Sequence, residues 1–230
     1  MSVDSPMPRS RRSFVGRLGQ LGLAAVVSPM AADRIGGGRA PSPSSRTAPG
    51  EWDLSWLAKL RNAPDSAVVD TTSIGGGLVF QIATRYLDNC DAVYGAGKHK
   101  ARVVLNLRVR AVGLGLNDDL WNKHALGIEY EVKDPVSKEP ATRNVYMALA
   151  ASDLAGLGSI NGLVERGAVI LVCDFALGHL ATRLATKGGR SPEEVHRELQ
   201  AGLVGGAFLV PSGIFGLARA QNAGCAYVNA

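Results

Sequence analysis

This sequence lacks the motifs that define most recognisable ligand sites. It has three cysteines and four histidines in 230 residues, and none of their spacings matches a zinc motif. It has no P-loop with its lysine and no dinucleotide-binding glycine fingerprint. We therefore expect no metal site and no cofactor of these kinds, and candidate chemistry has to be sought in single residues at informative places in the fold.

An excess of basic charge is also missing from most of the chain. The whole sequence has a net charge of +5. Residues 1–50 hold seven arginines and two aspartates, whereas residues 51–230 hold eighteen basic and eighteen acidic residues. Because the basicity belongs to the N-terminal segment, no basic face remains for a nucleic-acid partner.

No N-terminal apolar run is long enough for a stable membrane anchor. The short apolar stretch 21–27 follows the pair Arg11-Arg12, and the string SRRSFVGRL is similar to the twin-arginine export motif. Residues 1–32 are therefore predicted to be an export signal for the twin-arginine machinery, which gives a periplasmic or other extracytoplasmic location. The alternative is a disordered basic tail.

Bulky apolar residues are scarce in residues 33–50, DRIGGGRAPSPSSRTAPG. Such a segment cannot bury enough surface to become ordered, so it is predicted to be a disordered linker. The rest of the chain, residues 51–230, has the size of one domain.

That domain alternates strand and helix patterns. Strands are predicted at 66–70, 101–107, 168–172, 206–210 and 224–228, and helices at 52–60, 78–94, 117–126, 148–166, 174–187, 191–201 and 213–222. Residues 129–145 are predicted to form a surface hairpin. The alternation predicts an α/β fold of three layers, in which helices cover both faces of a mostly parallel five-stranded sheet.

The central stretch of the domain reads AVILVCDFAL, residues 168–177. Its apolar run predicts a buried parallel strand that ends at Cys173, and Asp174 is the predicted N-cap of the next helix. Cys173 would then lie at the edge of the sheet where ligands bind, beside a helix N-terminus that favours a thiolate. A buried core thiol is the alternative.

Other polar residues at predicted strand ends have two interpretations each. Asn117 and Asp118 either bind a cation or polar ligand, or serve as cap and first turn of a helix. Ser212 lies between a strand and a helix, but VPSGI is not a G-x-S-x-G nucleophile elbow, which favours a helix cap. Cys90 and Cys225 are either core residues or a disulfide pair.

Two segments carry a family resemblance: GAVILVCDFALGHLATRLATKGG and GAFLVPSGIFGLARAQNAGCAYV. They resemble the C-terminal half of the DsrE/DsrF-like sulfur-relay superfamily. VVLNLRVRAVGLGLNDDLW resembles the second strand and following loop of an exported, twin-arginine-bearing branch of that group. The resemblance implies a Rossmann-like α/β fold and a homo-oligomer. It also implies that Cys173 takes up a persulfide.

Two functions follow as hypotheses. In the first, Cys173 is a sulfur acceptor or redox thiol, a carrier more than a turnover enzyme, whose partner is a small sulfur-containing molecule or a thiol protein. In the second, the same edge binds a small ligand or partner without catalysis, through Asn117, Asp118, Asp174 and Ser212. A Cys173 sulfur sealed from solvent favours the second hypothesis.

Overall fold

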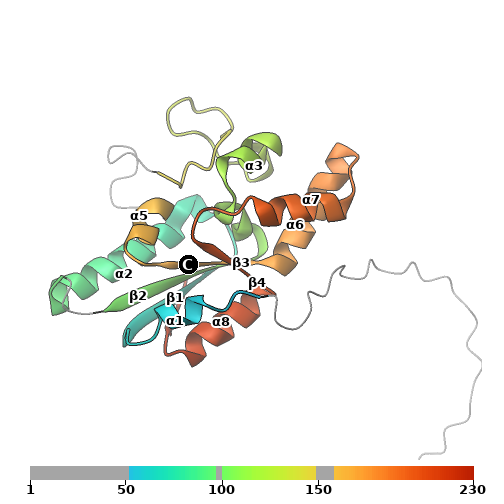
Figure 1. The fold of residues 1–230 in the computed structure, drawn as a ribbon. Helices are drawn as coiled ribbons and strands as arrows, with labels where there is room; N and C mark the ends of the chain where they lie inside the picture. Colours follow the sequence, from blue (N-terminus) through green and yellow to red (C-terminus); the bar gives the residue numbers. More distant parts are fainter. Residues whose placement is uncertain (1–51, 97–99, 149–157) are drawn as a thin grey trace, which may run out of the picture. The chain divides into compact units, whose positions relative to one another are not determined.

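The computed structural model describes residues 52–96, 100–148 and 158–230 (Figure 1). The predicted export signal and linker lie outside the described residues. The described residues belong to one compact unit of the chain. Among them, no helix has the length and apolarity needed to cross a membrane.

Five parallel strands form the central sheet. They are paired in the order β4-β3-β2-β1-β5. Their bounds are β1 Asp65–Thr71, β2 Ala101–Leu107, β3 Val169–Cys173, β4 Ala207–Val210 and β5 Ala226–Asn229. The prediction of a five-stranded α/β sheet is confirmed, and every strand pair is parallel.

Helices connect the strands. They are α1 Trp56–Lys59, α2 Leu78–Tyr94, α3 Asp118–Lys123, α4 Leu126–Glu129, α5 Ile160–Glu165, α6 Asp174–Gly188, α7 Pro192–Ala201 and α8 Gly213–Asn222, with 3₁₀ segments η1 Gly75–Gly77 and η2 Val109–Gly115. The N-caps Asn117, Ser159, Ser191 and Ser212 each accept a backbone N–H in the first turn of a helix. These caps explain why the helices begin where they do.

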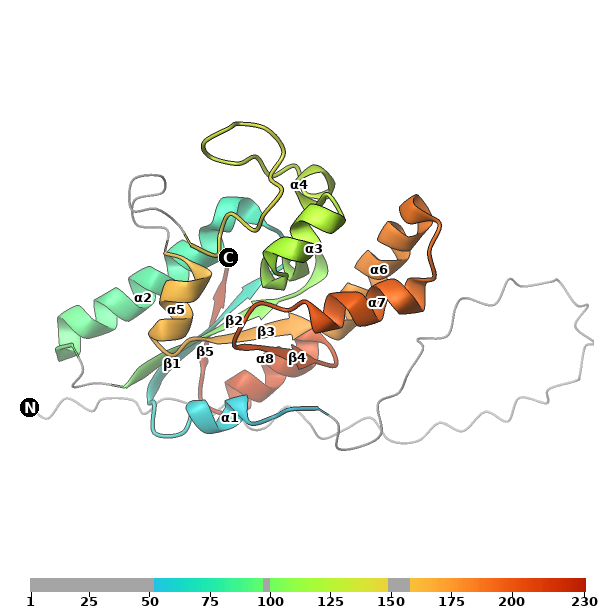
Figure 2. The ribbon, with the colours of Figure 1, turned by 45° about the horizontal axis from the view of Figure 1, so that its top comes forward.

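The strand order places helices on both faces of the sheet. From β1 to β4 each connection moves one strand along in the same direction, whereas β5 returns to the opposite edge beside β1. Since such crossovers are right-handed, the return helix α8 must lie on the face opposite to α2 and α6. Figures 1 and 2 show α1 and α8 on one side of the sheet and α2 and α5 on the other.

Each face has its own apolar core. The larger core lies under α2, α5 and α6 and includes Phe80, Leu105, Trp121, Ile170 and Leu180. The smaller core lies under α1 and α8 and includes Trp56, Val68, Val104, Leu171 and Val210. Alternation along each strand therefore decides which face a side chain reaches.

Four predicted elements differ from the structure, beginning with the helix predicted at 52–60, of which only α1, Trp56–Lys59, forms. The helix predicted at 117–126 is broken into α3 and α4 at Ala125, which has a φ of +47°. The break lets Gly127 pack so close to the backbone of Ala141 that a Cβ would lie 2.2 Å from its carbonyl oxygen. The helix predicted at 148–166 begins at Ile160 in the described part, and the hairpin at 129–145 is reduced to a single bridge between Lys133 and Pro140.

Candidate functional site

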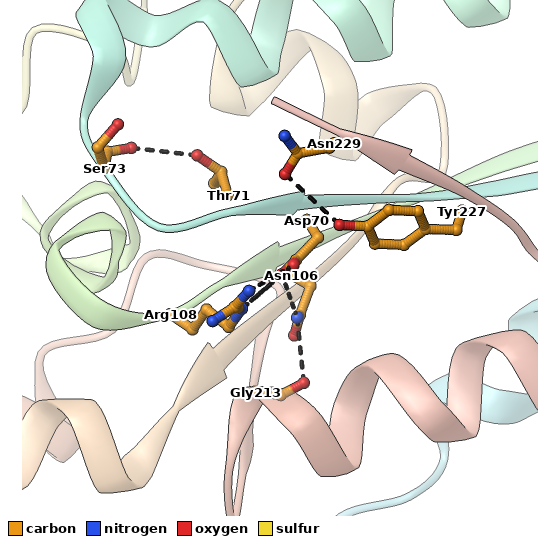
Figure 3. A network of polar contacts seen from close by, with 8 residues as sticks. All are labelled: Asp70, Thr71, Ser73, Asn106, Arg108, Gly213, Tyr227 and Asn229. Carbon is orange, nitrogen blue, oxygen red and sulfur yellow. Dashed lines mark hydrogen bonds and ion pairs between the residues drawn. The ribbon is translucent and has the colours of Figure 1, made fainter.

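A network of polar side chains lies where β1 and β2 end, on the α8 side of the sheet (Figure 3). The guanidinium of Arg108 binds the carboxylate of Asp70 through Nε at 2.9 Å and Nη2 at 2.8 Å. Asn106 donates its amide Nδ2 to Asp70 Oδ1 at 2.8 Å and to the carbonyl of Gly213 at 3.0 Å. Asp70 thus accepts from three donor nitrogens, one of Asn106 in β2 and two of Arg108 just after β2.

Burial differs sharply within this network. The side chain of Asp70 is 1% exposed, whereas that of Arg108 is 30% exposed. The hydrogen bonds that Arg108 donates to Asp70 raise the pKa of Arg108 against an opposing effect of burial, and Tyr227 and Cys173 contribute electrostatically in the same direction. The arginine therefore carries a fixed positive charge with part of its surface open to solvent.

Helix α8 packs tightly on this network because glycines face it. A Cβ on Gly213 would lie 2.7 Å from Cβ of Arg108, and one on Gly216 would lie 3.2 Å from Oδ1 of Asn106. Oδ1 of Asn106 is buried without a hydrogen-bond partner among the described residues. The first turn of α8 thus holds the stem of Arg108 in place.

The backbone beside Arg108 is held in an uncommon conformation. Val109, a β-branched residue, has a φ of +55° and a half-exposed side chain. The N–H of Arg108 binds the carbonyl of Thr71, the last residue of β1, and the N–H of Arg110 binds that of Thr72. Such strain costs of order 1–3 kcal/mol and persists only where surrounding contacts impose it, as they do at many ligand sites.

Cys173 lies at the same edge, on the next strand, but it is 4% exposed. Its Sγ accepts the N–H of Ala176 at 3.4 Å, so Cys173 is itself the N-cap of α6. The prediction that Asp174 caps this helix is wrong. Asp174 is the first helical residue, and its carboxylate contacts side chains of α7.

Two residues of α7 hold Asp174. Its Oδ1 lies 2.8 Å from Nε2 of His196 and accepts a hydrogen bond from Nε2 of Gln200 at 2.7 Å. The hydrogen bond with Asp174 raises the pKa of His196 despite partial burial of the ring. Asp174 therefore fastens α6 to α7 beside Cys173.

Ser212 lies next to Cys173 in the fold. Val210 pairs with Cys173, and the N–H of Phe175 binds the carbonyl of Pro211 at 3.3 Å. Ser212 Oγ accepts the N–H of Phe215 at 3.2 Å, which agrees with the predicted cap. The N-termini of α6 and α8 thus meet side by side at this edge.

Asn117 and Asp118 have structural partners elsewhere. Asn117 Oδ1 accepts the N–H of Leu120, so the cap interpretation holds for it. Asp118 Oδ1 accepts the N–H of Asn144 and anchors the loop after α4. Within the described residues, no hydrogen bond or ion pair connects either residue with Cys173, Ser212 or the Arg108 network.

The other two cysteines are buried free thiols, Cys90 in α2 and Cys225 before β5. Burial raises the pKa of Cys225 to about 11. Burial, together with Cys90, also raises the pKa of Tyr86 to about 12. No group of three metal-ligating side chains occurs in the described ranges.

Sequence reasoning missed the central members of the site, Asp70, Asn106 and Arg108. A signal was available: each is polar and lies at or just beyond the carboxyl end of a predicted apolar strand. Parallel strands bring such ends to one edge of the sheet.

Searches against protein-family models, curated proteins and solved structures gave no match for this chain.

Proposed function

We propose that this protein is an exported DsrE-like α/β domain that binds a small oxyanion at the carboxyl edge of its sheet. The ligand class is a carboxylate or a sulfur oxyanion such as thiosulfate. The observation that carries the proposal is the difference in solvent exposure at this edge. Cys173 is only 4% exposed, whereas the side chain of Arg108 is 30% exposed.

Charge favours an anion here. Asp70 neutralises Arg108 in net charge, but the N-termini of α6 and α8 each add roughly half a positive charge. The planar guanidinium suits the paired oxygens of a carboxylate or sulfur oxyanion. Because Asp70 and Gly213 fix the arginine before any ligand arrives, little side-chain entropy is lost on binding.

Exposed polar and aromatic groups complete the surface. The Tyr227 side chain on β5 is half-exposed, and its hydroxyl lies 3.5 Å from Oδ1 of Asn229 (Figure 3). Phe175 and Ile214, at the starts of α6 and α8, are also exposed. An anion with a small apolar part would find both kinds of contact at this edge.

A second candidate is favoured by the cap geometry of Cys173. Its sulfur accepts the N–H of Ala176 in the first turn of α6, so a sulfur group bound to Cys173 would lie at a helix N-terminus, where backbone N–H groups favour anions. As a carrier, the Cys173 thiolate would attack the outer sulfur of thiosulfate. The new bond joins the two sulfurs, the S–S bond of thiosulfate breaks, and sulfite leaves with its electron pair.

One experiment separates the two candidates. The full chain is titrated with thiosulfate and with acetate by calorimetry, and its intact mass is measured afterwards with and without reductant. The proposal predicts saturable binding that Arg108→Lys weakens about tenfold, since an ammonium lacks the paired donors. It also predicts that Cys173→Ser binds as the parent does and that no mass is gained.

A reducible gain of sulfur that disappears in Cys173→Ser would instead establish the carrier. Equal binding by the parent and Arg108→Lys would overturn the proposed site. Tyr227→Phe is a milder companion variant, because it removes one hydroxyl from an exposed ring and leaves the buried network intact.

A further inference from the structure

A cavity lies at the C-terminal end of α8, away from the carboxyl edge. Its volume is about 330 Å³, and six residues line it: Leu57, Leu60, Arg61, Arg219, Asn222 and Ala223. Along α8, which runs from Gly213 to Asn222, roughly 9 Å of helix lies between Gly213 and the lining residue Arg219, and the two sites share no residue. The two sites are therefore distinct.

Two arginines in this cavity lack acidic partners. No described carboxylate forms an ion pair with Arg61 or Arg219, and no acidic side chain is part of the lining. Arg219 lies over the ring of Phe215, 5.9 Å from its centroid. The C-terminus of α8 offsets about half a charge, which leaves a net positive cavity.

The remaining lining is mostly apolar. Leu60 is 3% exposed and Leu57 is partly buried, and both come from α1 and the residue that ends it. Trp56, the neighbour of Leu57, is fully buried in the core below. Ala223 adds a small apolar surface at the end of α8. The lining thus combines two cations and an amide with aliphatic carbon, and both the end of α1 and the end of α8 contribute to each kind.

We propose that this cavity binds a carboxylate with a short aliphatic chain. The carboxylate would bind the guanidinium groups of Arg61 and Arg219, with the Asn222 amide as a further donor, and the chain would lie on Leu57 and Ala223. The volume is at the lower end of ligand pockets, about 300–1,000 Å³, which selects a small molecule.

Octanoate is the probe for this site. It is titrated into the full chain, with binding followed by calorimetry and by tryptophan fluorescence, to which Trp56, the neighbour of the lining residue Leu57, contributes. We expect saturable binding of octanoate. Acetate, which lacks the aliphatic chain, and octanol, which lacks the carboxylate, should each bind at least about tenfold more weakly.

Substitutions locate the binding. Arg61→Gln and Arg219→Gln are each expected to weaken octanoate binding about tenfold. Arg85→Gln is the matched control, because Arg85 is an exposed arginine of α2 on the other face of the sheet. Arg108→Lys tests independence from the carboxyl edge: any octanoate bound at that edge is weakened, and we expect the affinity of the site at Arg61 and Arg219 to stay unchanged.

Three results would overturn this inference. Octanol binding as tightly as octanoate would show apolar partitioning only. Equal weakening by Arg85→Gln and Arg61→Gln would show a general charge effect. Loss of octanoate binding in Arg108→Lys alone would place the ligand at the carboxyl edge, a result that leaves the proposed function standing.

Discussion

The carboxyl edge of the sheet has two halves that satisfy their polar groups in different ways. At the ends of β1 and β2, Asn106 and Arg108 bind Asp70 across 36 and 38 residues of sequence, respectively. At the ends of β3 and β4, Cys173 and Ser212 bind N–H groups only three residues ahead. The first half therefore depends on tertiary structure and the second on local backbone. Replacing one of these side chains should lower the free energy of unfolding more in the first half than in the second.

The largest effect is expected for Asp70→Ala. It leaves the partly buried guanidinium of Arg108 without its carboxylate and removes one acceptor of Asn106. Breaking a buried ion pair by removing one partner costs about 3–5 kcal/mol, and because Arg108 is partly exposed we expect the lower value. Denaturant unfolding monitored by circular dichroism measures the change.

The double variant Asp70→Ala/Arg108→Ala sharpens this result. Once the unpaired charge is gone as well, stability should recover by about 1–3 kcal/mol relative to Asp70→Ala alone. Additive losses in the double variant would mean that the two residues do not act as a pair, contrary to the geometry.

A moderate effect is expected for Gly213→Ala. The new Cβ would lie 2.7–3.3 Å from the stem of Arg108, so the arginine must move away from Asp70. Crowding of this kind costs about 1–3 kcal/mol, and the gain in helix propensity offsets part of it. Thiosulfate affinity should fall together with the midpoint of unfolding.

Gly178→Ala is the control for that substitution. A Cβ at Gly178 would meet only His196, at an ordinary 3.9 Å. The helix gains propensity there, so the free energy of unfolding should rise by about 0.5–1 kcal/mol. If both alanines behaved alike, the close packing of α8 on Arg108 would not matter for stability.

A smaller effect is expected in the local half of the edge. Ser212→Ala removes the oxygen that accepts the N–H of Phe215, and loss of such a cap costs about 1 kcal/mol. Ser191→Ala, at the cap of the equally long α7, should lose a similar amount in thermal or denaturant unfolding. Only the Ser212 variant should also weaken anion binding.

The same contrast explains what could be predicted from the sequence. The five strands and the caps at Asn117, Ser191 and Ser212 were predictable because periodicity and capping act over a few residues. The network around Asp70 was not, because Asn106 and Arg108 become its partners only when β1 and β2 pair. The cap of α6 was mispredicted for a related reason, since His196 and Gln200 are distant in sequence from the carboxylate they hold.

The smallest effect concerns pH and the Asp174–His196 contact between α6 and α7. The hydrogen bond with Asp174 raises the folded-state pKa of His196 above its usual 6.5. The pair therefore stabilises the fold fully below pH 6.5, and this contribution is lost as the pH rises through the folded-state pKa. For a pair near the surface we expect at most about 1 kcal/mol. The free energy of unfolding should differ between pH 5.5 and pH 8, and His196→Gln and Asp174→Asn should each reduce that difference. An unchanged pH dependence in both variants would mean that this contact does not stabilise the protonated imidazole, and α7 would then be held to α6 by apolar packing alone.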